Sequence, residues 1–219
     1  MAAPYRKGQV LHSVFAAADC LRDAGFTLIA AQTRSAAREL GTAGRLEAFS
    51  DDELSNYYVF ASGEKRVQLF YEPTIWSYSK YSQPNELVDV FHAGTGYRSC
   101  WTPDFLIKTE KDGVGSYLVF DAKYSDHSNT KDKHLPEIIS KYYLKTRSLS
   151  KQGVVEAPGA IKAVYAFIPK SFNDDYGMYG GAFNLGDKLA SAPFFGYVKL
   201  SSDEERGFNS FVKQIIRAA

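Results

Sequence analysis

Residues 104–124 read DFLIKTEKDGVGSYLVFDAKY and carry the clearest strand pattern in the chain. Residues 104–108 and 116–124 are rich in branched and aromatic side chains, which favour β-strands. Lys111-Asp112-Gly113 lies between the two segments, and its Asp-Gly pair predicts a turn. The two strands are therefore predicted to fold back on each other as a hairpin, with the start of the first beside the end of the second.

Charged residues gather at one end of this hairpin. Side chains alternate along a strand, so Asp121 and Lys123 are predicted to lie on one face, beyond the apolar Val119. The opposite face is predicted to be core and carries Leu118, Phe120, Ala122 and Tyr124. Asp104 opens the first strand and is predicted to lie beside Asp121 and Lys123. Because buried charges are costly without partners, the three groups form either a surface ion pair at a strand end or a site for a hard cation such as Mg²⁺.

Outside the hairpin, strand-like and helix-like segments alternate. The predicted helices are residues 10–24, 135–149 (with Pro136 in the first turn) and 203–217, and the predicted strands are residues 26–31, 57–61, 66–73, 75–79, 161–168 and 193–200. Residues 62–65 are predicted to form a hairpin turn, and residues 80–99 and 125–133 to form loops. This order of elements predicts an α/β fold with a central mixed β-sheet flanked by helices.

The composition is that of a globular protein. The chain has 219 residues, of which 45% are hydrophobic and 23% charged, which predicts a single domain spanning residues 1–219. The formal net charge of +1 gives no support to non-specific binding of phosphate backbones, so a nucleic-acid role requires a local basic patch. With two cysteines, no convincing signal peptide and no membrane-length apolar run, a cytoplasmic protein with no membrane contact is expected.

Residues 101–126, WTPDFLIKTEKDGVGSYLVFDAKYSD, resemble the signature of the PD-(D/E)XK nuclease superfamily. Pro103-Asp104 is similar to the PD element, and Asp121-Ala122-Lys123 is similar to the (D/E)XK element. Within the superfamily the stretch is most similar to McrC-like and related defence-associated nuclease domains. The resemblance implies a restriction-endonuclease-like core at about residues 84–170.

The resemblance also implies a role for each residue of the motif. Asp104 and Asp121 would bind Mg²⁺ or Mn²⁺, with the Ala122 carbonyl as a further ligand. The metal would polarise the scissile phosphate and lower the pKa of a bound water. Lys123 would position that water and stabilise charge on the phosphate. The implied activity is hydrolysis of phosphodiester bonds in DNA, with RNA not excluded, in a restriction or anti-phage defence system.

Two further groups of residues follow from this comparison. Family members often carry a Gln or Lys and a Tyr on the helix after the motif, and Lys141 and Tyr142 resemble such a pair. Lys141, Tyr142 and Lys145 are therefore candidate phosphate or DNA contacts. The alternative is a solvated helix face, because Glu137, Lys141 and Lys145 fall at i, i+4 and i+8. Many relatives also carry an acidic residue on the first helix, for which Asp19 is the candidate here.

Other polar and aromatic residues give weaker signals. His92, His127 and His134 have no spacing typical of zinc sites, and we interpret them as surface histidines. Residues 127–131 are either a solvated loop or a DNA contact. Tyr176, Tyr179 and Phe183 either pack on the sheet or stack on bases.

Three functions are compatible with these residues. The first is the metal-dependent endonuclease, which would draw its specificity from a partner subunit, another domain or a homo-oligomer. The second is a nuclease fold retained as a module that binds nucleic acid or a partner protein, with weak or no cleavage. The third is an unrelated hydrolase that uses Asp104 and Asp121 as an acid–base pair.

Overall fold

The computed structural model describes residues 14–32, 57–80, 86–92, 99–111, 114–123, 127–168, 176–178 and 194–199, together with residues 82, 84 and 125. The predicted helix at residues 203–217, the turn at residues 112–113, Tyr124, and the aromatic residues Tyr179 and Phe183 lie outside the described residues. Within the described part of the chain, no helix is both long enough and apolar enough to cross a membrane.

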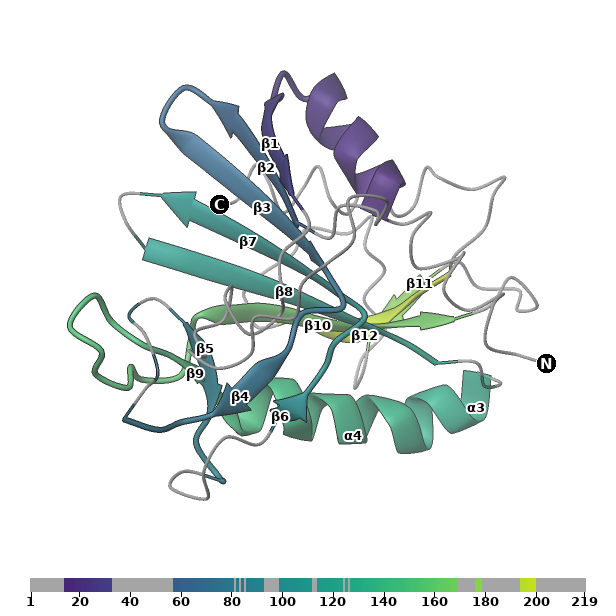
Figure 1. The fold of residues 1–219 in the computed structure, drawn as a ribbon. Coiled ribbons are helices and arrows are strands. Elements are labelled where there is room, and N and C mark those ends of the chain that lie inside the picture. The colour runs from purple at the N-terminus through teal and green to yellow at the C-terminus, as the bar shows by residue number, and fades with distance from the viewer. Residues whose placement is uncertain are drawn as a thin grey trace.

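An eight-stranded mixed sheet dominates the structure, which confirms the predicted α/β class at this level (Figure 1). Its strand order is β1-β2-β3-β7-β8-β10-β12-β11. The strands are β1 (Thr27–Gln32), β2 (Tyr57–Ser62), β3 (Lys65–Tyr71), β7 (Phe105–Lys111), β8 (Val114–Ala122), β10 (Ile161–Ile168), β11 (Tyr176–Met178) and β12 (Phe194–Lys199). The first five strands in this order pair antiparallel, and β8, β10 and β12 pair parallel.

Two hairpins build the antiparallel half of the sheet. The β2–β3 hairpin closes at Ser62↔Lys65, and Gly63 in its turn has φ of 60°, a left-handed conformation that glycine adopts readily. The β7–β8 hairpin runs from Lys111↔Val114 to Phe105↔Phe120. Both hairpins agree with the sequence, because local alternation and turn residues are sufficient to specify them.

A second, four-stranded sheet has the order β6-β4-β5-β9. It contains β4 (Ile75–Ser77), β5 (Leu87–Asp89), β6 (Ser99–Trp101) and β9 (Thr146–Ser148). The prediction of a loop at residues 80–99 was wrong for β5, which is buried throughout. A strand of three residues is too short for alternation to show, and its burial comes from partners β4 and β9, which are distant in sequence.

Residues 127–144 form one continuous helical segment, made of α3 (His127–Asn129), η1 (Thr130–His134), α4 (Leu135–Ile138) and η2 (Ile139–Leu144). The predicted loop at residues 125–133 was therefore wrong from His127 onward, and the helix ends at Leu144 rather than at residue 149. Thr130 is fully buried although its neighbours are polar, so one side of this turn packs inward. Pro136 lies inside the segment rather than at its start, and π-helical turns flank the position where proline breaks the regular hydrogen-bond ladder.

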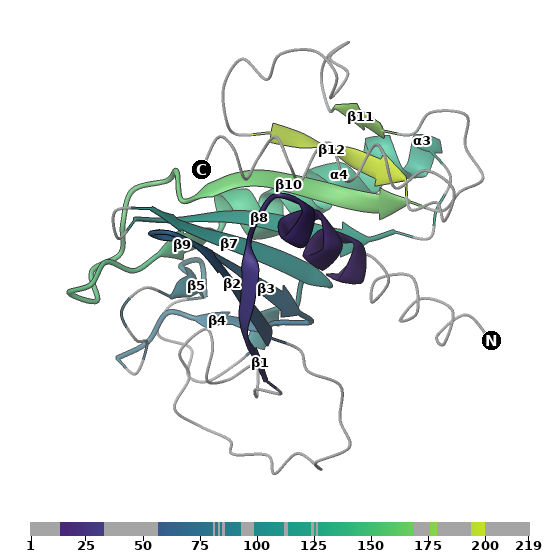
Figure 2. The ribbon, with the colours of Figure 1, turned by 90° about the horizontal axis from the view of Figure 1, so that it is seen from above.

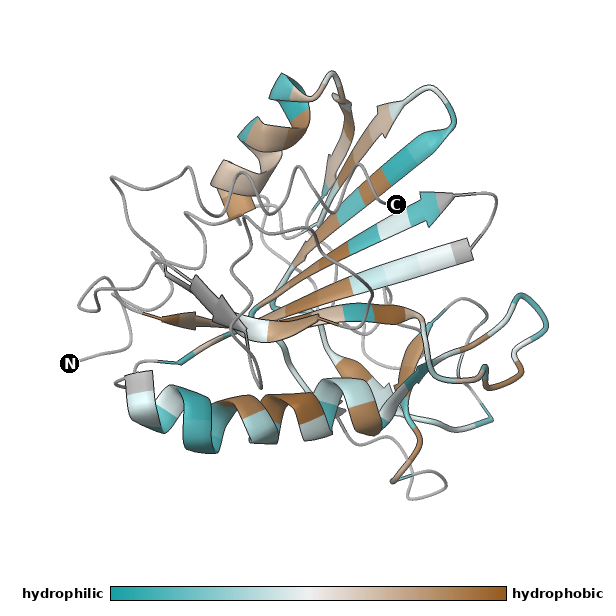
Figure 3. Ribbon diagram, turned by 180° about the vertical axis from the view of Figure 1, so that it is seen from behind, coloured by the Kyte–Doolittle hydropathy of each residue, from teal (hydrophilic) through white to brown (hydrophobic). Residues whose placement is uncertain are grey.

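The two faces of the large sheet carry separate hydrophobic cores. Figures 1 and 2 show one helix on each face. The helix at residues 14–23, which confirms the described part of the predicted first helix, packs on the face of Leu118, Phe120 and Ala122. The 127–144 helix packs on the face of Tyr117 and Val119. Hydrophobic residues line the inner parts of the strands, whereas the outer ends of β3 and β7 are hydrophilic (Figure 3). Asp121 follows Val119 on the second face, so the helix placed there determines its surroundings.

Candidate functional site

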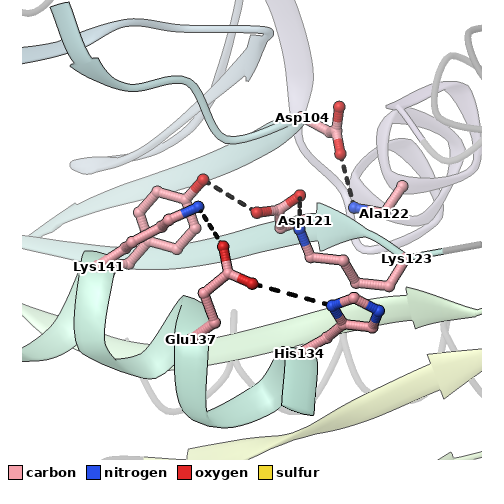
Figure 4. A network of polar contacts seen from close by, with 8 residues as sticks. Asp104, Asp121, Ala122, Lys123, His134, Glu137 and Lys141 are labelled. Carbon is pink, nitrogen blue, oxygen red and sulfur yellow. Dashed lines mark hydrogen bonds and ion pairs between the residues drawn. The ribbon is translucent and has the colours of Figure 1, made fainter. Parts of the chain in front are cut away.

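Strands β3 and β8 end, and β7 begins, on the same side of the large sheet, and an acidic residue lies at each of these three strand ends. Strand β3 pairs with β7 up to Tyr71↔Phe105, and β7 pairs with β8 up to Phe105↔Phe120. The residues just beyond these pairs are Glu72, Asp104 and Asp121. The backbone N–H of Ala122 donates a hydrogen bond of 2.6 Å to Asp104 Oδ2. The predicted closeness of Asp104 to the end of β8 is therefore confirmed (Figure 4).

Asp121 is a buried carboxylate with partners on both oxygens. The residue is 5% exposed. The Lys123 ammonium lies 3.2 Å from Asp121 Oδ1, and the Tyr142 hydroxyl donates a 3.0 Å hydrogen bond to Oδ2. The Lys123 side chain is itself only 16% exposed, so this is not the solvated ion pair of a strand end. Breaking a buried pair from one side leaves an uncompensated charge, which is strongly destabilising.

The backbone holds Lys123 at this place. Its N–H donates a hydrogen bond of 2.7 Å to the Phe167 carbonyl, so pairing with β10 continues one residue beyond the end of β8. Because side chains alternate along a strand, this extension keeps Lys123 on the same face as Asp121. The predicted shared face of Asp121 and Lys123 is confirmed by their ion pair.

The structure places the Tyr142 hydroxyl, which the sequence suggested as a phosphate contact, against the Asp121 carboxylate. Its side chain is buried beneath the helix, with the residue 2% exposed. Burial raises the pKa of the Tyr142 hydroxyl, and the charges of Asp121, Asp104 and Glu137 raise it further. The hydroxyl therefore stays protonated and acts as a permanent donor to Asp121.

Lys141 and Glu137 form an ion pair on the same helix. The Lys141 ammonium lies 2.6 Å from Glu137 Oε1, and His134 Nδ1 lies 3.9 Å from Glu137 Oε2. The hydrogen bond from Lys141 lowers the pKa of the Glu137 carboxyl. The predicted i, i+4 pair therefore exists, and Figure 4 shows it projecting toward Asp121 and Lys123 rather than away from them. His134 has 25% of its side chain exposed, and its Nδ1 is too far from Glu137 for a hydrogen bond, so the contact is attractive only when the ring is protonated.

Two candidates from the sequence lie elsewhere. Lys145 places its ammonium 5.5 Å from the centre of the Trp101 ring and 5.6 Å from that of Phe91, near the small sheet. Asp19 lies on the helix that covers the opposite face of the large sheet, is 69% exposed, and pairs with Arg22 at 3.1 Å. The structure therefore does not bring Asp19 to Asp121, because the sheet separates them.

Glu72 is a residue that sequence reasoning missed. Its N–H donates a 3.0 Å hydrogen bond to the Asp104 carbonyl, which places it beside the first acid of the motif. Its φ of 48° is in the left-handed region, and it is the one non-glycine residue with positive φ in the described chain. Such a conformation costs about 1–2 kcal/mol for a residue with a Cβ. In the sequence, Glu72 is marked only by the Pro73 that follows it at the end of the predicted strand 66–73. That Glu72 would lie beside Asp104 could not be predicted, because the two residues are far apart in the chain.

The donor set at this edge is chemically suited to a hard divalent cation. Asp104 and Asp121 contribute two formal negative charges and Lys123 one positive charge, which leaves one net negative charge before Glu72 is counted. Carboxylate oxygens are the ligands that Mg²⁺ and Mn²⁺ prefer. Among the described residues, no three or more His, Cys, Asp or Glu side chains cluster closely enough to form a metal-binding group. The site is therefore a two-carboxylate site with a third acid on the adjoining strand end.

Comparisons of the chain with protein-family models, with curated proteins and with solved structures found no match.

Proposed function

We propose that this chain is a metal-dependent nuclease of the PD-(D/E)XK kind, which hydrolyses phosphodiester bonds of DNA on a restriction-endonuclease-like core. The observation that carries the proposal is the meeting of Asp104 with the end of β8, where Lys123 pairs with a 5% exposed Asp121. The low net charge of the chain favours a partner subunit, a further domain or a second copy as the source of specificity, as in restriction or anti-phage defence.

In this proposal Asp104, Asp121 and the Ala122 carbonyl would hold Mg²⁺ or Mn²⁺, and Glu72, whose backbone lies beside Asp104, would add negative charge near the site without being a ligand. The metal, when bound, supplies Lewis-acid polarisation of the phosphate and a more acidic water. Two carboxylates and a carbonyl are a sufficient protein contribution, because Mg²⁺ usually keeps several waters and also binds substrate phosphate.

The remaining residues of the site orient Asp121 or supply positive charge. Lys123 Nζ, at 3.2 Å from Asp121, is the ammonium that stabilises charge developing on the attacked phosphate. Tyr142 holds Asp121 in one rotamer through its hydroxyl, so it is a positioning residue. Lys141, held by Glu137, is the next positive group along the helix and is proposed to contact an adjacent phosphate.

Plasmid nicking in Mg²⁺, Mn²⁺ or EDTA tests the proposal. Asp121→Asn and Lys123→Met are expected to lower stability and to abolish metal-dependent nicking, so nicking is compared at a temperature at which circular dichroism shows each variant to be folded. Asp132→Asn and Lys151→Met are matched controls, because both side chains belong to exposed residues of the same chain. Calorimetric titration with Mn²⁺ gives a second readout, in which Asp121→Asn should lose binding. Nicking by Asp121→Asn at the wild-type rate would reject the nuclease.

The second candidate function is a non-cleaving module that binds nucleic acid or a partner protein. One observation favours it: Lys123 and Tyr142 occupy both oxygens of Asp121, so this carboxylate is balanced without a cation. The module predicts DNA binding that is indifferent to Mg²⁺, together with no hydrolysis in either metal. The nuclease predicts Mn²⁺ binding that depends on Asp104 and Asp121.

A further inference from the structure

Aromatic and positive side chains cluster at the C-terminal end of the 127–144 helix. Figure 1 shows the small sheet next to this end of the helix. We define this cluster as the aromatic platform, made of Phe91, His92, Trp101, Lys141 and Lys145. The Lys145 ammonium lies over the rings of both Phe91 and Trp101, and the Lys141 ammonium lies 5.7 Å from the centre of the Trp101 ring. The His92 ring meets the Trp101 ring edge-on at 5.9 Å.

Phe91 is unusual because it is a large apolar side chain that is 70% exposed on a well-held loop. The fully buried Asp89 carboxylate accepts a 2.9 Å hydrogen bond from the Phe91 N–H and a short one from His92 Nδ1. The Val90 N–H donates a 2.9 Å hydrogen bond to the Lys145 carbonyl, which ties the loop to the end of the helix. The loop therefore presents Phe91 to solvent in a defined position, at the cost of exposing a hydrophobic ring.

The positive charges of the aromatic platform indicate which kind of ligand it can bind. An aromatic cage for a cation would present rings without ammonium groups, whereas here two lysines already lie over the rings. Within the described part of the chain, Lys145 has no carboxylate at ion-pair distance. An exposed aromatic ring next to the Lys145 ammonium is complementary to a base joined to a phosphate, with Lys141, which pairs with Glu137, as a second positive group nearby.

We propose that the aromatic platform binds an unpaired nucleotide of single-stranded DNA, with the base stacked on Phe91 and the phosphate held by Lys145 and Lys141. This inference rests on the proposed nuclease function and extends it to the form of the substrate. Lys141 links the two places, because it touches Trp101 on one side and Glu137 of the candidate site on the other. A base paired in a duplex is already stacked between its neighbours, so only an unpaired base can use an exposed ring in this way.

Binding in EDTA tests the proposal without cleavage. Fluorescence anisotropy would compare a short labelled oligothymidylate, an abasic strand of the same length and a duplex. Loss of one stacked base is worth about 5- to 160-fold in affinity, so Phe91→Ala should weaken oligothymidylate binding by this factor and leave the abasic strand unchanged. Lys145→Met should weaken both single strands. Leu144→Ala is the matched control, since Leu144 is 53% exposed on the same helix end.

The outcomes separate this inference from the function on which it rests. The platform is rejected if wild type does not bind the single strand, if Phe91→Ala binds it as tightly as wild type, or if the loss is equal for abasic and thymidylate strands. If the platform is rejected while Asp121→Asn still abolishes nicking, the nuclease stands with another mode of DNA binding. If Asp121→Asn nicks normally but Phe91→Ala loses the single strand, the platform stands and the nuclease does not.

Discussion

Replacing Tyr142 with phenylalanine removes one hydroxyl from the centre of the candidate site. That hydroxyl donates a 3.0 Å hydrogen bond to Asp121, which is 5% exposed. The substitution leaves almost no cavity, so the expected loss is that of a hydrogen bond to a charged acceptor, about 1.5–3 kcal/mol. For a chain of this length such a loss lowers the melting temperature by roughly 3–12 °C.

Thermal and urea denaturation followed by circular dichroism would measure this loss. Tyr143→Phe is the matched control, because its half-buried ring packs edge-on against Phe195 and its expected change is below about 0.5 kcal/mol. A double-mutant cycle with Asp121→Asn should be non-additive by about 1 kcal/mol or more, since the two residues share one hydrogen bond.

The same substitution separates positioning from catalysis. If Tyr142 orients Asp121, Tyr142→Phe should weaken Mn²⁺ binding by about 10- to 100-fold, the usual effect of losing a residue that orients a ligand, and should lower kcat more than KM. The reasoning is refuted if Tyr142→Phe is as stable as Tyr143→Phe, or if the two substitutions in the cycle are additive.

Three further outcomes are expected. Burial raises the pKa of three tyrosines, so they keep their protons above pH 10 in the folded protein and lose them in the unfolded chain. The free energy of unfolding is therefore highest below about pH 10 and falls above it by about 1.4 kcal/mol per pH unit for each tyrosine. Urea denaturation at increasing pH measures this fall. These tyrosines are Tyr117, Tyr142 and Tyr165. Glu72→Gly should lower metal-dependent nicking but leave the melting temperature unchanged or higher, because glycine adopts the positive φ at this position without strain. Glu72→Gln should lower nicking without changing the melting temperature. Full nicking activity in both variants would show that Glu72 does not belong to the site. Lys141→Met should return the pKa of Glu137 toward its ordinary value in an NMR titration. The Lys141–Glu137 pair should add at most about 0.5 kcal/mol to the free energy of unfolding. This contribution is present above the ordinary Glu pKa and is lost as the pH falls through the lowered pKa of Glu137.

The sequence was sufficient to predict elements that are specified by residues close together in the chain. The β7–β8 hairpin combines alternation with a turn, so the face shared by Asp121 and Lys123 was predictable from spacing alone. The same reasoning failed for residues 127–133, which contain no apolar residue. Their helix continues from the apolar turns around Leu135 and Ile138, and among the side chains described at residues 128–133 it buries only Thr130. The polar composition of residues 127–133 indicated a loop. A helix that packs on a sheet, however, buries side chains on one side only, and its other residues can all be polar.

What the sequence by itself determined is the hairpin, its charged end and the separation of its two faces. The tertiary structure alone decided which distant residues complete that end: Tyr142 as the donor to Asp121, Glu72 beside Asp104, and Asp19 on the far side of the sheet. The reason is physical. Alternation and turn chemistry act between neighbours along the chain, but the order of strands in a sheet and the choice of helix for each face depend on how the whole chain buries its apolar surface.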